Sequence, residues 1–177
     1  MRTLVAYESM FGNTHAIAAY IAEGLLALGE VEAVSIHEVT RERLAQCDLF
    51  VVGGPTHVHG LTSSQSRKGA ADTAAKSDGS LLLDPDAEGP GLRDWFHDCP
   101  VVDGTLGAAF DTRYDANPLL TGRASRRIAR RLGDLGFEVI AEPESFLVDK
   151  DNTLLMGERE RARAWGAGLA HALTARL

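Results

Sequence analysis

The segment from Thr3 to Leu26 restricts the fold of this chain more than any other. An apolar run, Leu4–Tyr7, is followed by small and polar residues up to Thr14, and then by an alanine-rich segment with apolar residues at helical spacing. This order predicts a buried strand, a tight turn and a helix. Because parallel strands are joined by crossover helices, a strand that leads directly into a helix is typical of α/β proteins.

The turn between this strand and this helix has the composition of a phosphate-binding loop. Backbone N–H groups in the first turn of a helix are unpaired and carry a partial positive charge, so they bind anions without a lysine or arginine. Ser9 and Thr14 add hydroxyl donors, and Gly12 allows close approach of the backbone. The predicted phosphate loop consists of Ser9, Met10, Phe11, Gly12, Asn13 and Thr14. An ordinary strand-to-helix turn with a threonine cap is the alternative.

Strand and helix patterns alternate along the rest of the sequence. Further strands are predicted at 32–37, 49–53, 105–110 and 138–148, the last of them interrupted by Pro143. Helices are predicted at 14–28, 40–46, 91–99, 122–135 and 158–176. We therefore expect residues 1–177 to form a single α/β domain, with a doubly wound parallel sheet of five strands.

The loop from Tyr7 to Thr14, followed by Ala18 and Ile21, resembles the phosphate loop of flavodoxins, which bind flavin mononucleotide (FMN). Ala6 departs from the larger apolar residue that this family usually carries, and the resemblance stays intact. The resemblance extends over most of the chain. It implies the strand order 2-1-3-4-5, with FMN at the switch between strands 1 and 3.

The same resemblance implies that two further loops enclose the flavin ring. After the third strand these residues are Pro55, Thr56, His57, Val58, His59 and Gly60, and after the fourth strand they are Asp111, Thr112, Arg113 and Tyr114. Flavodoxins often have a tryptophan in the first of these loops and this sequence has none, so a residue at 57–59 would contact the ring. Tyr114 would stack on the ring. Alternatively, His57 and His59 are only polar turn residues, and Arg113 is only an exposed loop residue.

The segment between the third and fourth strands is longer than the fold requires. Residues 62–90 are rich in Ser, Gly, Ala, Asp and Pro, and we expect a long mobile insertion that is partly helical at 68–76. Ten acids and three bases lie between Asp72 and Asp115. We expect some of these acids, including Asp84, Asp86 and Glu88, to lie at the rim of the flavin site and to steer basic partners. Five arginines between 123 and 131 are interpreted as a solvated helix face.

Several classes of protein are disfavoured by composition. The net charge of −7 argues against nucleic acid as the main partner. No apolar run is long enough for a membrane span, and the chain begins without an apolar signal segment. Cys47 and Cys99 form neither a metal motif nor a disulfide framework, which favours the cytoplasm. His57 and His59 lack a third metal ligand, so no metal site is predicted.

These observations favour an FMN-binding electron-transfer protein that docks with redox proteins near the flavin and uses no catalytic acid or base. Two alternatives stay open. One is an FMN-dependent NAD(P)H:quinone or protoporphyrinogen-type oxidoreductase, in which the insertion forms a lid or a dimer contact. The other is a flavin-free module of the same fold that serves as an interaction domain.

Overall fold

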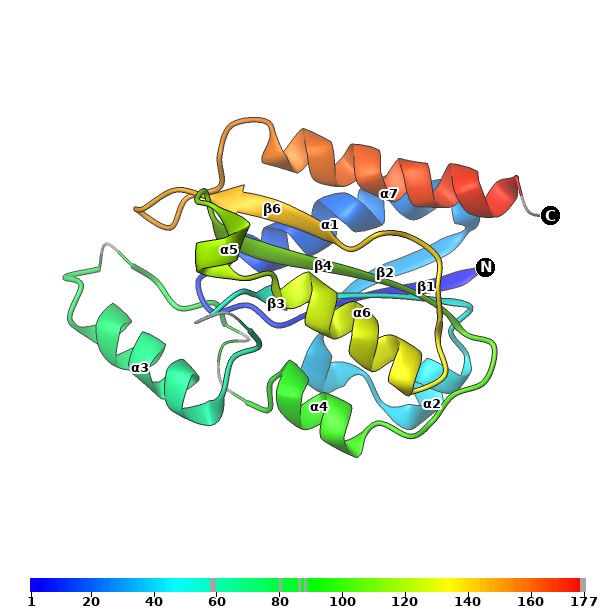
Figure 1. Cartoon of the computed structure of the whole chain (residues 1–177), viewed down its shortest axis with the longest axis horizontal. Coiled ribbons are helices and arrows are strands. Elements are labelled where there is room, and N and C mark those ends of the chain that lie inside the picture. The colour runs from blue at the N-terminus through cyan, green and yellow to red at the C-terminus, as the bar shows by residue number, and fades with distance from the viewer. Residues whose placement is uncertain (58–59, 80, 86, 88, 176–177) are drawn as a thin grey trace.

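A parallel sheet with helices on both faces forms the centre of the molecule, as a computed structural model of residues 1–57, 60–79, 81–85, 87 and 89–175 shows (Figure 1). The strands are β1 (Arg2–Tyr7), β2 (Glu30–Ser35), β3 (Leu49–Pro55), β4 (Leu106–Tyr114), β5 (Glu138–Val139) and β6 (Glu144–Val148). Their order is β2-β1-β3-β4-β5, and β6 also pairs with β4. The predicted α/β fold and strand order are confirmed.

Two strand boundaries differ from the sequence prediction. The predicted fifth strand is divided into β5 and β6, which pair with opposite ends of β4. Pro143 lies just before β6, and proline has no N–H group to contribute to a sheet. The fourth strand runs to Tyr114 rather than ending at Phe110, because β3 and β6 pair with its polar end. Asp111–Tyr114 therefore belong to a strand and not to a loop.

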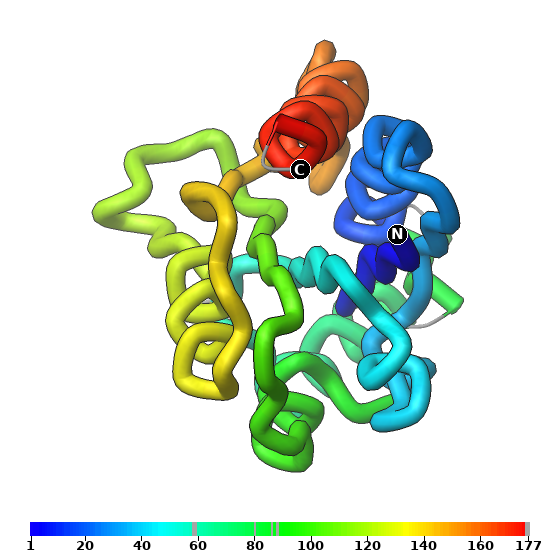
Figure 2. Tube along the Cα trace, turned by 90° about the vertical axis from the view of Figure 1, so that its right-hand side faces the viewer, coloured from blue at the N-terminus to red at the C-terminus, as the bar shows by residue number. Residues whose placement is uncertain are grey.

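Each face of the sheet has its own hydrophobic core. In β1, Leu4 and Ala6 point into one core, while Val5 and Tyr7 point into the other. The helices α1 (Asn13–Leu25) and α7 (Glu158–Thr174) cover one face, and α2 (Arg41–Ala45), α4 (Leu92–Asp98) and α6 (Ala124–Asp134) cover the other (Figure 2). Short helical turns are η1 (Leu26–Leu28), η2 (Ile36–Glu38) and α5 (Pro118–Thr121).

The helices α1 and α7 pack against each other with their backbones in contact. A Cβ atom on Gly24 would overlap the carbonyl oxygen of Arg163, and a Cβ atom on Gly166 would overlap that of Ile21. Glycine at both positions therefore allows an approach that no other residue permits. Because α1 also begins at the predicted phosphate loop, this contact fixes the direction in which the N-terminus of α1 points.

A helix runs through much of the 62–90 insertion. It is α3 (Ser64–Ala75), which begins four residues before the predicted helical part. Ser63 and Ser66 form a reciprocal capping box at its start. None of its residues is fully buried, so no hydrophobic face holds α3 against the rest of the molecule. No helix in the described part of the chain is both long enough and apolar enough to cross a membrane.

Candidate functional site

A cavity of about 810 Å³ lies at the carboxyl end of the sheet. It falls within the size range of small-molecule and cofactor sites, roughly 300–1,000 Å³. Residues from all three predicted loops meet in its wall. They are Met10, Phe11, Asn13, Thr14, Pro55, Thr56, His57, Thr112, Arg113 and Tyr114.

The remaining predicted residues lie elsewhere. Ser9, Gly12, Gly60 and Asp111 are outside the lining of the cavity. Val58 and His59 lie outside the described residues. The structure thus brings most of the predicted phosphate loop and of both predicted ring loops to one place.

Gly12 shapes the phosphate loop at the start of α1. It has φ of 84°, a left-handed conformation, and its N–H donates to Ser9 Oγ at 3.1 Å. The serine hydroxyl therefore holds the turn. Among the described residues no side chain caps the N-terminus of α1, so within this part of the chain the first-turn N–H groups lack the usual side-chain acceptor. This arrangement suits a phosphate, which would act as the missing cap.

Two hydrogen bonds connect this loop to the rest of the cavity wall. The hydroxyls of Thr14 and Thr112 lie 2.8 Å apart and are buried, which links α1 to β4. Asn13 Nδ2 donates to the carbonyl oxygen of Asn152 at 2.7 Å. These contacts hold the loop rigid, as preorganised binding of a ligand requires.

Asp84 lies beside the phosphate loop and is not an exposed rim residue. Its side chain is only 1% exposed and its Oδ2 lies 3.2 Å from His15 Nδ1. Its N–H donates to the carbonyl oxygen of Met10 at 2.8 Å, and His15 stacks on Tyr7. The prediction that Asp84 belongs to an acidic rim that steers basic partners is therefore wrong. Its contacts with Met10 and His15 bury the carboxylate. Asp86 and Glu88 lie outside the described residues.

The sequence interpretation missed two walls of the cavity. One is α3, which contributes Ser66, Gly69, Ala70 and Thr73. These positions follow helical spacing, so they share one face. The other is the segment after β6, including Lys150 and Asn152. The Ser63–Ser66 capping pair was the signal in the sequence that could have located the start of α3.

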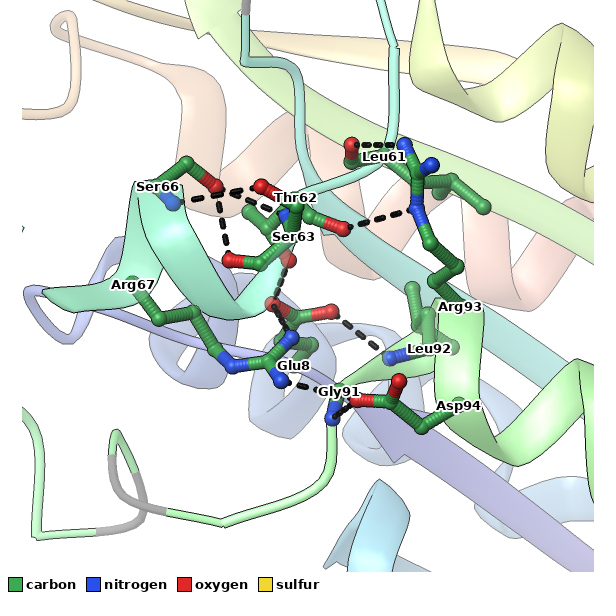
Figure 3. Close-up of polar contacts among 10 residues, drawn as sticks. All are labelled: Glu8, Leu61, Thr62, Ser63, Ser66, Arg67, Gly91, Leu92, Arg93 and Asp94. Atoms are coloured by element: carbon green, nitrogen blue, oxygen red, sulfur yellow. Dashed lines mark hydrogen bonds and ion pairs between the residues drawn. The ribbon is translucent and has the colours of Figure 1, made fainter.

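A buried polar cluster fastens α3 and α4 to the end of β1 (Figure 3). Glu8 directly follows β1, and its carboxylate accepts hydrogen bonds from the Thr62 hydroxyl and from the Leu92 N–H at 2.8 Å. Arg67 of α3 lies 4.0 Å from Glu8 and 2.8 Å from Asp94. A buried carboxylate needs such partners, so this cluster determines where α3 sits over the cavity.

Asp111 supports a helix instead of lining the cavity. Its Oδ2 accepts a hydrogen bond of 2.7 Å from the N–H of Ser125 in the first turn of α6. Burial raises the pKa of Asp111, and the hydrogen bond from Ser125 opposes that rise. Its position in a strand turns its side chain towards α6 and away from the cavity.

Comparison with known proteins connects this geometry to one family. Residues 5–165 match the family model described as flavodoxin. A solved flavodoxin from the domain Archaea is 18% identical, with a TM-score of 0.65 over 98% of this chain and 99% of that one. Flavodoxin 2 from Bacillus cereus is 23% identical, with a TM-score of 0.63 over the whole of both chains.

A larger protein contains a similar fold as one of its parts. The flavodiiron protein from Giardia intestinalis is 18% identical, with a TM-score of 0.61, and the match covers 98% of this chain and 36% of that one. No curated protein matches the sequence. At these identities the solved structures show a shared fold, and the family model shows the family.

Proposed function

The chain belongs to the flavodoxin family, and from this premise we propose that it binds FMN and passes electrons between redox proteins. The flavin supplies the redox chemistry, and the protein binds and orients it. One observation carries the proposal: the N-terminus of α1, which is shaped by Gly12 and has no side-chain cap from the described residues, adjoins a cavity lined by all three predicted loops. No catalytic acid or base is needed from the chain.

The residues present fit the phosphate end of FMN. The first-turn N–H groups of α1 would bind the phosphate, and the held positions of Asn13 and Thr14 keep those groups in place. The buried carboxylate of Asp84 is unfavourable to an anion, but it already contacts the His15 imidazole at 3.2 Å. Helix-terminal phosphate sites need no lysine or arginine.

The ring would lie between the two strand-end loops. Tyr114 ends β4, lines the cavity and is 52% exposed, which leaves its ring available for stacking. His57, two residues after the end of β3, also lines the cavity. We therefore keep Tyr114 and His57 as the ring contacts, with Arg113 beside them.

Tyr114→Ala is expected to weaken FMN binding by about 1–2 kcal/mol, because an aromatic face contributes roughly 0.5–1.5 kcal/mol beyond burial. It should also restore flavin fluorescence that stacking quenches. A fluorescence titration with FMN measures both effects. Tyr20→Ala is the matched control, because Tyr20 lies on α1 beside Arg159 and Arg163 and does not line the cavity. If both variants bind FMN equally well, the stacking role belongs to the 55–60 loop.

An FMN-dependent oxidoreductase is the second candidate, and the wall formed by α3 favours it. Ser66, Ala70 and Thr73 line the cavity with small side chains, so a small substrate could bind beside the ring. The two candidates differ in turnover. An oxidoreductase of this kind reduces quinones with NAD(P)H and no other protein, whereas an electron carrier requires a separate reductase.

Absorbance spectra of the purified protein, before and after addition of FMN, test the proposal. We expect a bound-flavin spectrum with one FMN per chain, and no quinone reduction by NAD(P)H until a reductase is added. Sustained quinone reduction without a reductase would favour the oxidoreductase. Failure to bind added FMN would leave the flavin-free interaction module.

Two further parts of the proposal concern the chain as a whole. We propose that residues 1–177 act as a single domain, because elements from both ends of the chain share one sheet and its two cores. We also propose a cytoplasmic location. Cys47 and Cys99 are free thiols, and burial raises the pKa of each to about 11, which keeps them protonated and unreactive.

A further inference from the structure

The solvent face of α6 carries four exposed arginines. Arg126, Arg127, Arg130 and Arg131 are exposed, and within the described part of the chain none of them makes an ion pair or a side-chain hydrogen bond. Arginines elsewhere, such as Arg67, Arg161 and Arg163, pair with carboxylates. Like charges four residues apart destabilise a helix. The stability of α6 therefore does not explain this cluster.

The N-terminal end of α6 adjoins the cavity. The N–H of Ala124 donates to Thr56 Oγ1 at 2.8 Å, and Thr56 lines the cavity. Gly60, in the same loop, packs so close to Arg127 that an added Cβ would come within 2.8 Å of its guanidinium. A molecule bound at Arg127, in the N-terminal half of α6, would therefore sit beside the proposed flavin site.

Exposed apolar side chains lie on the chain segment that joins the cavity wall to α6. The short helix α5 joins β4 to α6 (Figure 1), and its Leu119 and Leu120 are 88% and 73% exposed. Tyr114, at the end of β4, is also half exposed. Apolar residues bordered by charged ones are typical of protein interfaces. We call Tyr114, Leu119, Leu120 and the four arginines the α5–α6 face.

Two of the acids between Asp72 and Asp115, which were predicted to contribute to an acidic rim, do not expose their carboxylates. Asp84 and Asp111 both have buried side chains. Arg113 and Lys150 bring positive charge to the cavity wall, and Asp151 brings one negative charge. Asp115 is exposed next to Tyr114, but the four arginines of α6 outnumber it. The α5–α6 face is therefore basic, although the chain has a net charge of −7.

We infer that the α5–α6 face docks a redox protein whose own docking surface is acidic. This inference rests on the proposed function, because the docked protein exchanges electrons with the flavin. One electron leaves the reduced flavin and reduces the oxidised centre of the partner, and no bond is made or broken. An acidic patch on a protein can contact this face alone. A nucleic acid or an anionic membrane carries negative charge over a larger area, and the acidic remainder of this chain would repel that charge.

Binding of an acidic b-type cytochrome, followed by calorimetry at low salt, tests the inference without requiring electron transfer. The variants R126E/R130E and R127E/R131E change the charge of the face. The control R41E/R159E changes the net charge equally at two exposed residues on α2 and α7. We expect each face variant to weaken binding by about tenfold or more and the control by less than about twofold. A basic c-type cytochrome should bind the face variants more tightly than the unsubstituted protein.

Reduction rates supply a second measurement. Stopped-flow reduction of the acidic cytochrome by the photoreduced, FMN-loaded protein should slow as salt rises, and the face variants should lose this dependence. The inference is overturned if the face variants and the control bind the acidic cytochrome equally well, or if the unsubstituted protein does not bind it. It is also overturned by binding of duplex DNA that the face variants abolish while they still bind the cytochrome. Failure to bind FMN would overturn only the proposed function, because the calorimetric comparison does not need the flavin.

Discussion

Riboflavin, which lacks the phosphate of FMN, is expected to bind this protein at least about 100-fold more weakly than FMN. Each charge-assisted hydrogen bond from a first-turn N–H of α1 is worth about 1.5–3 kcal/mol, and two of them account for a factor of this size. Parallel titrations with the two flavins measure the difference. Equal affinities would mean that the Ser9–Thr14 loop does not bind phosphate.

Gly12→Val tests the same loop from the side of the protein. A β-branched residue at φ of 84° is strained by about 1–2 kcal/mol, and relief of that strain would move the N–H groups that the phosphate needs. We expect the affinity for FMN to fall by about tenfold or more, because loss of one charge-assisted hydrogen bond costs at least about 1.4 kcal/mol, which corresponds to a factor of ten. Thr14→Val, which breaks the bond to Thr112, should weaken FMN in the same direction.

Gly157→Val is the matched control for Gly12→Val. Gly157 precedes α7 with φ of 86° and ψ of −10°, nearly the conformation of Gly12, and nothing lies near an added Cβ. Both variants should therefore lower the free energy of unfolding by a similar amount. Only Gly12→Val should weaken FMN binding. If both variants lose the same affinity for FMN, the effect comes from reduced stability alone.

The second large effect is expected at the contact between α1 and α7. Gly166→Ala should lower the free energy of unfolding by about 1–3 kcal/mol or more, because its methyl group would overlap the backbone of Ile21 and force the helices apart. Gly168→Ala, two residues along the same helix, should raise it by about 1 kcal/mol, since alanine favours a helix and nothing lies near this position.

Urea denaturation of both variants measures this pair of opposite effects. Because the two substitutions are chemically identical and lie on one helix, intrinsic helix preference cancels in the comparison. A stabilising effect at both positions would show that α1 and α7 are not in backbone contact. The contact between α1 and α7 predicts that Gly166→Ala lowers the free energy of unfolding and that Gly168→Ala raises it.

The parts of the molecule that the sequence predicts well depend on local pattern. The strand, turn and helix of residues 3–25 follow from an apolar run, Gly12 and helical spacing within one short segment. The continuous apolar run at 49–53 likewise predicts the buried centre of β3. Buried parallel strands consist largely of such apolar runs, which is why the fold and strand order could be inferred.

The missed parts depend on contacts between distant residues. The polar end of β4 becomes strand because β3 and β6 pair with it, and nothing in Asp111–Arg113 indicates that pairing. Asp84 is buried by His15, far away in the sequence. The helix α3 has no apolar face from which its place could be inferred, and its small residues become meaningful only when they line a cavity.

The hydrogen bond between Asp84 and Met10 has a thermodynamic consequence. Through it the 62–90 insertion touches the phosphate loop directly, so ordering of the insertion and occupancy of the loop are linked equilibria. If FMN favours the ordered insertion by some factor, the ordered insertion must favour FMN by the same factor. The insertion would then regulate cofactor retention reciprocally, and amide hydrogen exchange at Asp84 would report cofactor occupancy from outside the ring site.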